Sequence, residues 1–408
     1  MNFWKKLGLG KQILIGIAVG LIIGFVSPKA AEVISPLGDI FLRMLKMLIV
    51  PLVFFSITAG ICKMGDTKQL RNVGLRYVAW IVISAIIAAL IGVAVGLIAQ
   101  PGAGMTEFLA DAEAVEASEY NFINNVVSWF PTNIVESMVN ANLLQIIMFT
   151  LFLGVALLAL GDRVSGLVKI IDQCSDTMLK ITEFVINFSP IGIMSLIATL
   201  VTSISGAMMV EVIKFIILDN ISGVIIFAVY PILVQLMTKG KIKYGRFLKK
   251  ISTPVLVALS TSSSAATLPV SIKTCDEKIG IPENIYGFTL PLGNTCGMTG
   301  FAMFIGLCCI FASNLYGFPV TAARIMQFVF LGLILSIGAA GVKGAGVVMS
   351  GVLLESLGMP LTLIPILAAI WPAIDPCHTT LNNTGDLAGT IIVADTLNAI
   401  DYDIYNKD

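Results

Sequence analysis

The sequence predicts an all-α polytopic membrane protein with about eight transmembrane helices and two re-entrant helical hairpins. Three observations lead to this fold class. Of the 408 residues, 57% are hydrophobic and only 12% are charged, whereas about a quarter are charged in soluble proteins. Apolar runs of about 20 residues, each long enough to cross a bilayer, recur along the chain. Polar or glycine-rich breaks interrupt apolar segments in the second half, where a lipid-facing helix does not tolerate them.

The apolar runs define the predicted spans and their orientation. The first follows a lysine-rich start without a convincing cleavage site, so we expect a retained helix and no removed signal peptide. Basic residues after the second and sixth runs predict cytoplasmic loops, whereas the acidic segment 102–120 has no lysine or arginine and predicts an external loop. An even number of spans then places both termini in the cytoplasm. The runs begin near Gln12, Asp39, Arg76, Leu143, Leu167, Glu211, Tyr286 and Leu361.

A first hairpin is predicted between the sixth and seventh spans, from Ile251 to Ile281. Its centre, Ser260 to Pro269, is rich in small hydroxyl residues and ends on a proline. This pattern indicates two short helices joined by a non-helical tip, which must be buried in protein or face a water-filled cavity. An ordinary serine-rich cytoplasmic loop is the alternative. The apolar flank Val255 to Leu259 favours the hairpin.

A second break lies at Gly338 to Gly346, between apolar segments 325–337 and 347–357. Its four glycines in nine residues allow a close backbone approach to a ligand or ion, although glycines can also serve helix packing alone. A third break, Pro291 to Gly300, predicts unwound backbone within the seventh span. Broken helices in corresponding positions are typical of secondary transporters whose site lies near the bilayer midplane.

Polar residues in the last span form one predicted helix face. Counted from the first, they lie at offsets 0, 3, 4, 7 and 11, which fall on one face of a helix at about 100° per residue. Each polar or charged group at membrane depth costs about 2 to 4 kcal/mol on insertion scales, so such a face indicates a binding site or a pathway. The five residues are Asp375, His378, Thr379, Asn382 and Asp386.

The chemistry of these side chains suggests their roles. Asp386, with Asn382 and the carbonyls freed near Gly297, suits a desolvated sodium ion that requires hard oxygen ligands. Asp375 suits a substrate ammonium group. A protonated acid, or an ion pair with Lys343, is the alternative for these carboxyl groups. His378, the only histidine and next to Asp375 on this face, either hydrogen-bonds a substrate side chain or titrates and makes transport depend on pH.

Over nearly its whole length the chain resembles the dicarboxylate/amino acid:cation symporter family, which includes the glutamate transporters. The resemblance rests on Ser262 to Pro269, Pro291 to Gly293, Gly341 to Gly346, and Asn382 to Asp386 with Gly389 and Thr390. It implies a glutamate-transporter-like fold and a homotrimer of independent subunits. It also implies a static scaffold (1–75 and 106–205) and a transport domain (76–105 and 206–408) that moves like an elevator.

The resemblance further implies binding residues, with the second hairpin as the gate. Asp375 is expected to hold the substrate amino group and Asn382 its carboxylate. Thr295 and Met298 match positions near a second sodium site. The expected substrate-binding residues are Ser263, Ser264, Gly344, Asp375, His378, Thr379, Asn382 and Lys343. The expected sodium-binding residues are Asp386, Asn382, Gly293, Gly297, Thr295 and Met298.

The chain departs from the family pattern at three places. The family motif Asn-Met-Asp-Gly-Thr is replaced by Gly297 to Phe301, which removes an amide and a buried acid that help to hold a sodium ion. Fewer coupled sodium ions are therefore expected. His378 stands where members with acidic substrates carry an arginine, a permanently charged bidentate donor. Lys343 stands where relatives commonly have proline, and it keeps an acidic substrate as an alternative.

These observations predict a sodium-coupled importer of a small neutral amino acid such as serine, threonine or alanine. The alternatives are a symporter of an acidic amino acid or dicarboxylate, coupled to sodium or protons, and an anion-conducting channel. An enzyme is not expected, because Asp375 and His378 share one helix and no nucleophile elbow accompanies the serines. We expect the plasma (inner) membrane as location, lipid, sodium and substrate as partners, and neither a cofactor nor a nucleic-acid partner.

Overall fold

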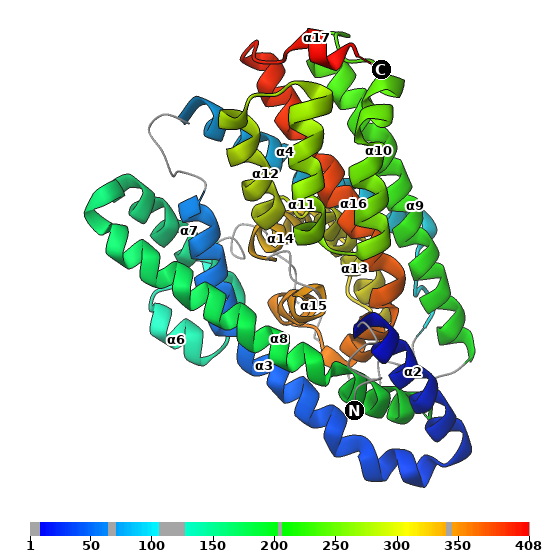
Figure 1. Cartoon of the computed structure of the whole chain (residues 1–408). Coiled ribbons are helices and arrows are strands. Elements are labelled where there is room, and N and C mark those ends of the chain that lie inside the picture. The colour runs from blue at the N-terminus through cyan, green and yellow to red at the C-terminus, as the bar shows by residue number, and fades with distance from the viewer. Residues whose placement is uncertain (1–8, 64–70, 106–126, 203–205, 340–344, 408) are drawn as a thin grey trace, which may run out of the picture.

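The computed structural model describes residues 9–63, 71–105, 127–202, 206–339 and 345–407. Across these residues every regular element is a helix (Figure 1). The first half contains α2 (Leu9–Val26), α3 (Pro28–Lys63), α4 (Arg71–Ala99), α6 (Ile134–Val139), α7 (Leu143–Leu160), the 3-10 turn η3 (Gly161–Val164) and α8 (Ser165–Val201).

The second half begins with one long helix, continues with short broken ones and ends with another long helix. Its elements are α9 (Gly206–Met237), α10 (Tyr244–Thr261), α11 (Ser264–Lys273), the π-helical turn η4 (Thr274–Ile279), α12 (Glu283–Cys296), α13 (Thr299–Tyr316), α14 (Ala322–Gly338), α15 (Ala345–Ser356), the 3-10 turn η5 (Leu361–Leu363), α16 (Ile364–Thr396) and α17 (Tyr402–Tyr405).

The predicted spans correspond to observed helices. Among the described residues, six stretches are long and apolar enough to cross a membrane: 28–62, 72–99, 145–199, 206–237, 283–316 and 361–396. The stretch 145–199 is divided at η3 into α7 and α8, and α2 is a shorter apolar helix. Together these give the expected eight spans, and the chain is an all-α multi-pass membrane protein.

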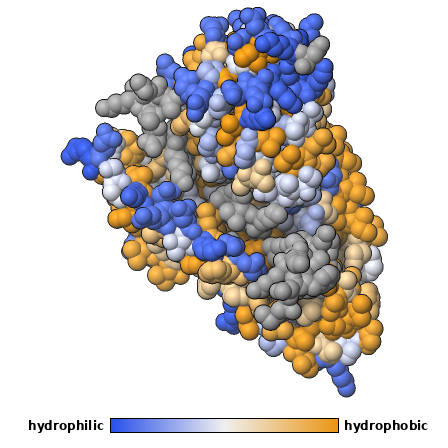
Figure 2. All heavy atoms as spheres, viewed as in Figure 1, coloured by the Kyte–Doolittle hydropathy of each residue, from blue (hydrophilic) through white to orange (hydrophobic). Residues whose placement is uncertain are grey.

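The surface of the molecule matches a membrane environment. Large apolar side chains are exposed along the helices, for example Phe25 at 74% and Ile98 at 85%. Figure 2 shows hydrophobic residues along the sides of the molecule, and hydrophilic residues gathered at the end that carries α17. In water such exposed apolar area would be unfavourable, whereas in lipid it is not.

One group of helices consists of α2, α3, α7 and α8, and it extends from α7 at the left of Figure 1 to α2 at the lower right. Within this group α8 packs along α2 and α3, and α3 packs along α7. Three glycines of α2, spaced four residues apart, lie against backbone carbonyls of α8. An added Cβ on Gly16, Gly20 or Gly24 would meet the carbonyl oxygen of Pro190, Met194 or Ala198, respectively. Small residues at this spacing allow two membrane helices to approach closely.

The other group contains α4 and α9 to α16, in the upper right part of Figure 1. Its closest crossing joins α4 to α13. An added Cβ on Gly92 would meet the carbonyl oxygen of Met303, and one on Gly306 would meet that of Ala89. The glycines are therefore reciprocal contact points, and α4 belongs with the second half of the chain although it precedes α6 to α8 in sequence.

The structure confirms two of the three predicted breaks, and it describes the helices on either side of the remaining one. The first hairpin turns between α10 and α11, where Ser262 has a left-handed backbone (φ 46°). The seventh span is interrupted at Gly297 and Met298, between α12 and α13. The helices α14 and α15 flank the predicted break at 338–346, whose tip at 340–344 lies outside the described residues. One expected boundary was wrong, because the second span begins at Pro28 and not near Asp39.

Candidate functional site

The predicted polar face of the last span is part of one continuous helix, α16. The helix runs through Pro372 and Pro376 without a break. Four of the five predicted side chains are buried, whereas Asp375 is partly exposed. A buried polar face needs partners from neighbouring helices, and the structure shows which helices supply them.

The partner of His378 is Asp219 of α9. The imidazole Nε2 lies 2.8 Å from Oδ2 and 3.1 Å from Oδ1 of the carboxylate. Both side chains are almost completely inaccessible, with 3% and 0% exposed. An ionised carboxylate only accepts hydrogen bonds, so with Asp219 ionised Nε2 is the donor of this pair. The carboxylate that contacts the ring therefore comes from another helix, α9.

Aromatic rings enclose the other sides of the imidazole. The ring centroids of Phe304 on α13 and Trp371 on α16 each lie 5.6 Å from that of His378. Gly300 allows this approach, since an added Cβ would overlap the backbone of His378. The Nδ1 atom of His378 and the Nε1 atom of Trp371 are buried without a hydrogen-bond partner among the described residues.

Asn382 connects α16 to the break in the seventh span. Its Oδ1 accepts a hydrogen bond from the Gly300 N–H at 2.7 Å, and its Nδ2 donates to Sδ of Met298 at 3.1 Å. The side chain is therefore fixed at the unwound backbone, as the sequence predicted. Two residues of the expected sodium-binding set, Asn382 and Met298, are in direct contact.

Asp386 lies against the end of α12. An added Cβ on Gly293 or on Gly297 would overlap its carboxylate, so only glycine fits at both positions. The described hydrogen bond to this buried carboxylate is a long one, 3.4 Å from the hydroxyl of Tyr77. A carboxylate beside unwound backbone brings hard oxygen atoms together, the ligand type that small cations prefer. Asp386, Gly293 and Gly297 are therefore brought together as expected.

Aromatic residues surround the substituted motif. The hydroxyls of Thr299 and Tyr230 lie 2.6 Å apart, and both residues are buried. Trp80 of α4 donates from Nε1 to the carbonyl oxygen of Gly385 at 2.9 Å. Its ring centroid lies 6.2 Å from that of Tyr230. The surroundings of Thr299 are thus aromatic and hydroxyl groups, which are weaker cation ligands than a carboxylate.

The tip of the first hairpin contacts α16. Ser263 is the N-cap of α11 and accepts a hydrogen bond from the Ala266 N–H at 3.3 Å. The buried Ser264 accepts a hydrogen bond at 3.2 Å from Nδ2 of Asn383. Asn383 also donates to the carbonyl oxygen of Thr379 at 2.8 Å. The tip therefore reaches the α16 face, although through a neighbour of the predicted Asn382.

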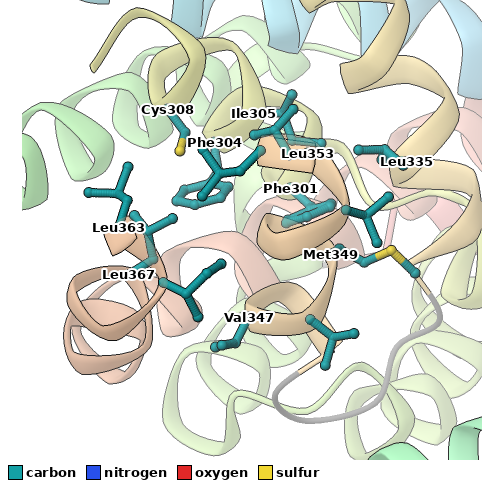
Figure 3. Close-up of a cluster of buried hydrophobic side chains, with 14 of the residues drawn as sticks. Phe301, Phe304, Ile305, Cys308, Leu335, Val347, Met349, Leu353, Leu363 and Leu367 are labelled. Carbon is teal, nitrogen blue, oxygen red and sulfur yellow. The ribbon is translucent and has the colours of Figure 1, made fainter. Parts of the chain in front are cut away.

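The second arm of the second hairpin packs onto the aromatic residues beside His378. Figure 3 shows Val347, Met349 and Leu353 of α15 in one hydrophobic cluster with Phe301 and Phe304 of α13. The whole cluster is buried and also includes residues of α14 and α16. Burial of this apolar surface holds α15 against the site.

Three predicted residues have no demonstrated place in the site. Lys343 and Gly344 lie outside the described residues. Thr295 is half-buried, and its hydroxyl donates back to the carbonyl oxygen of Leu292 at 2.9 Å, within its own helix. Its side chain is thus already satisfied in α12, and its expected role near a second sodium ion stays a prediction.

The sequence analysis missed Asp219, Asn383 and Trp371. A signal for Asp219 was present, since an acidic residue inside the apolar span 206–237 needs a partner or a function. Asn383 and Trp371 carry no comparable signal, because amides and aromatic rings are common in packed helices. Their importance follows from which helices lie beside α16, and a single helical face does not contain that information.

Comparison with known proteins agrees with this architecture. Residues 9–396 match the model of the Sodium:dicarboxylate symporter family. The chain is 28% identical over 401 residues to the Proton/sodium-glutamate symport protein of Bacillus caldotenax, covering 96% of this chain and 94% of the relative. It is 28% identical to the Proton/glutamate-aspartate symporter of Escherichia coli (strain K12), with 95% and 93% covered. The C4-dicarboxylate transport protein of Bacillus subtilis (strain 168) is also 28% identical, with 98% and 96% covered.

Proposed function

We propose that this secondary active symporter, which belongs to the Sodium:dicarboxylate symporter family, carries a small neutral amino acid together with sodium. The family and the relatives are transporters and not enzymes. The observation that carries the proposal is the face of α16, where an accessible acid, a buried histidine and a buried acid lie along one helix beside the broken seventh span.

The proposed sodium site is centred on Asp386. Its carboxylate is buried, has only the long hydrogen bond from Tyr77 described above, and lies against Gly293 and Gly297. A buried carboxylate without a strong partner is unfavourable, and a cation would compensate it. Asn382, which is fixed at the same break, completes the proposed ligand set. Sodium suits these oxygen atoms, although some relatives are named as proton-coupled symporters.

A second sodium site near Thr295 and Met298 is proposed from the family pattern. The aromatic surroundings of Thr299 support the expectation that fewer sodium ions are coupled than in members with the full motif. Sodium binding before the substrate would order the site and reduce the cost of closing the gate, which is how a cation couples to a substrate.

The proposed substrate site lies between α16 and the hairpin tips. Asp375 is only partly buried, and its carboxylate is the group proposed to bind the substrate ammonium. Asn382 and Thr379, with Ser263 and Ser264 from the first tip, would bind the carboxylate of the amino acid. Asp375 would also disfavour plain dicarboxylates, because two like charges would then lie close together.

A neutral substrate is proposed because His378 cannot replace a guanidinium group. Arginine offers a permanent charge and a bidentate fork, whereas the imidazole has one nitrogen engaged by Asp219. The alternative is an acidic amino acid or dicarboxylate, coupled to sodium or protons, as named for the relatives. Lys343 at the second tip would then supply the positive charge. An anion-conducting channel is a further alternative of another class.

The two helix groups support a transport mechanism of the elevator type. The group with α2, α3, α7 and α8 would be the scaffold, and the group with α4 and α9 to α16 would move. The reciprocal glycine contacts of α4 with α13 would keep the moving group together. A homotrimer, a location in the plasma (inner) membrane and cytoplasmic termini complete the proposal.

Uptake into liposomes tests the proposed function. The purified protein is reconstituted, and radiolabelled serine and aspartate are supplied separately with and without an inward sodium gradient. Sodium-driven serine uptake is the expected result. Aspartate uptake in place of serine would support the acidic alternative, and currents without coupled uptake would support the channel.

A further inference from the structure

We propose that Asp219 determines substrate selectivity through His378, by cancelling any positive charge that the imidazole brings to the binding site. The inference rests on the proposed function, since it concerns the side chain of the transported amino acid. Asp219 would be a positioning residue that acts through His378 and excludes acidic side chains.

The geometry makes the two side chains a single unit. The carboxylate approaches Nε2 with both oxygen atoms, at 2.8 and 3.1 Å, from a different helix. Both side chains are at least 97% buried, so water does not screen the interaction. Phe304 and Trp371 cover other sides of the ring, which leaves the imidazole little freedom to turn away.

The charge of this unit follows from its protonation states. With a neutral imidazole and an ionised carboxylate, the net charge is −1, and with a protonated imidazole it is zero. In neither state does the unit present a net positive charge to a substrate. An acidic side chain placed beside His378 would meet no net countercharge, and the carboxyl group of Asp375 lies on the same helix face. A neutral side chain avoids this repulsion.

The other ring nitrogen, Nδ1, gives the pair of Asp219 and His378 a preference for substrates with a hydroxyl group. Because Nε2 holds the proton toward Asp219, Nδ1 of a neutral imidazole is an acceptor. This atom is buried and has no hydrogen-bond partner in the described part of the chain. A side-chain hydroxyl is a donor that satisfies such an acceptor. Serine and threonine therefore fit the unit better than aspartate or glutamate.

A purely structural role is the competing explanation. The pair also ties α9 to α16, and its loss would reduce stability without changing selectivity. The two explanations differ in one readout: the ratio of aspartate to serine uptake within the same preparation. A structural defect lowers both rates together, whereas a charge effect changes their ratio.

The experiment compares wild type, Asp219→Asn, His378→Arg and the double variant in liposomes with a sodium gradient. We expect Asp219→Asn to raise the aspartate-to-serine ratio at least tenfold, because asparagine keeps a hydrogen-bond acceptor and loses the charge. We expect His378→Arg alone to stay selective for serine, since Asp219 would neutralise the new cation. The double variant should have the highest ratio of the four.

The outcomes separate this inference from the proposed function. Wild type without sodium-driven amino acid uptake would refute the proposed function itself, and wild type that prefers aspartate would overturn both. If wild type prefers serine, an unchanged ratio in Asp219→Asn and the double variant would overturn this inference alone. Efficient aspartate uptake by His378→Arg would also overturn it, and that variant leaves Asp219 intact. Glu211→Gln, near the start of α9, is the matched control and should leave the ratio unchanged.

Discussion

Gly346, close to the start of α15, lies directly against the indole ring of Trp371 on α16. An added Cβ at this glycine would overlap the ring, so no larger residue fits while both helices keep their positions. Trp371 in turn touches the imidazole of His378 and the ring of Phe304. The indole ring of Trp371 therefore links the second hairpin to the histidine of the site.

This contact predicts that Gly346→Ala impairs closure of the second hairpin. Overpacking a close contact costs about 1 to 3 kcal/mol, which corresponds to a change in affinity of roughly 5- to 150-fold. We expect the serine concentration for half-maximal uptake to rise about tenfold. Gly351→Ala on the same helix is the control, because an added Cβ there makes only ordinary contacts. Equal effects of the two substitutions would contradict the proposed contact.

Asp375 is predicted to anchor the substrate ammonium group. Asp375→Asn removes the charge, keeps the size, and affects a side chain that is only partly buried, so the fold should persist. Amino acid uptake should fall to background, because the ammonium group would lose its countercharge. Stabilisation of the purified variant by sodium in a thermal-shift assay should remain. Retained serine uptake with normal affinity would refute the role of Asp375.

The helices of this protein were predictable because their apolar runs are long and their breaks are chemically distinct. Gly297 illustrates this, since the break occurs within the predicted segment of glycines and polar residues. The start of the second span was missed because hydropathy detects the membrane-embedded part of a helix. The additional turns of α3 contain Lys29 and Glu32, which extend the helix without adding to the apolar run.

The site was predictable as a helix face but not as a set of partners. Helical periodicity placed His378 and Asp386 on one side of α16, and the structure agrees. It could not identify Asp219 as the partner of His378, because the relative position of two helices depends on side-chain packing along both. The two partners are 159 positions apart in the sequence, and the segment between them contains most elements of the second half of the chain.

The close contact between the glycines of α2 and the backbone of α8 predicts that a larger residue at one of these glycines lowers the stability of the protein. Gly20→Leu would force α2 away from α8, because a side chain there meets the carbonyl of Met194. Loss of this packing should lower the melting temperature of the purified protein by several degrees, since about 1 kcal/mol shifts it by 2 to 4 °C in chains of 150 to 250 residues. Gly166→Leu on α8 should have little effect, because nothing lies within 4 Å of an added Cβ there.

Asp386 provides the most direct test of cation coupling. Asp386→Asn removes the proposed charged ligand while the glycines beside it still admit a side chain of the same size. The sodium concentration for half-maximal uptake should rise at least tenfold, since an amide compensates a cation less well than a carboxylate. Asp395→Asn, on the same helix, is the matched control, because Asp395 pairs with Lys241 and Tyr402 away from the site. An unchanged sodium dependence in Asp386→Asn would show that the coupling ion binds at another site.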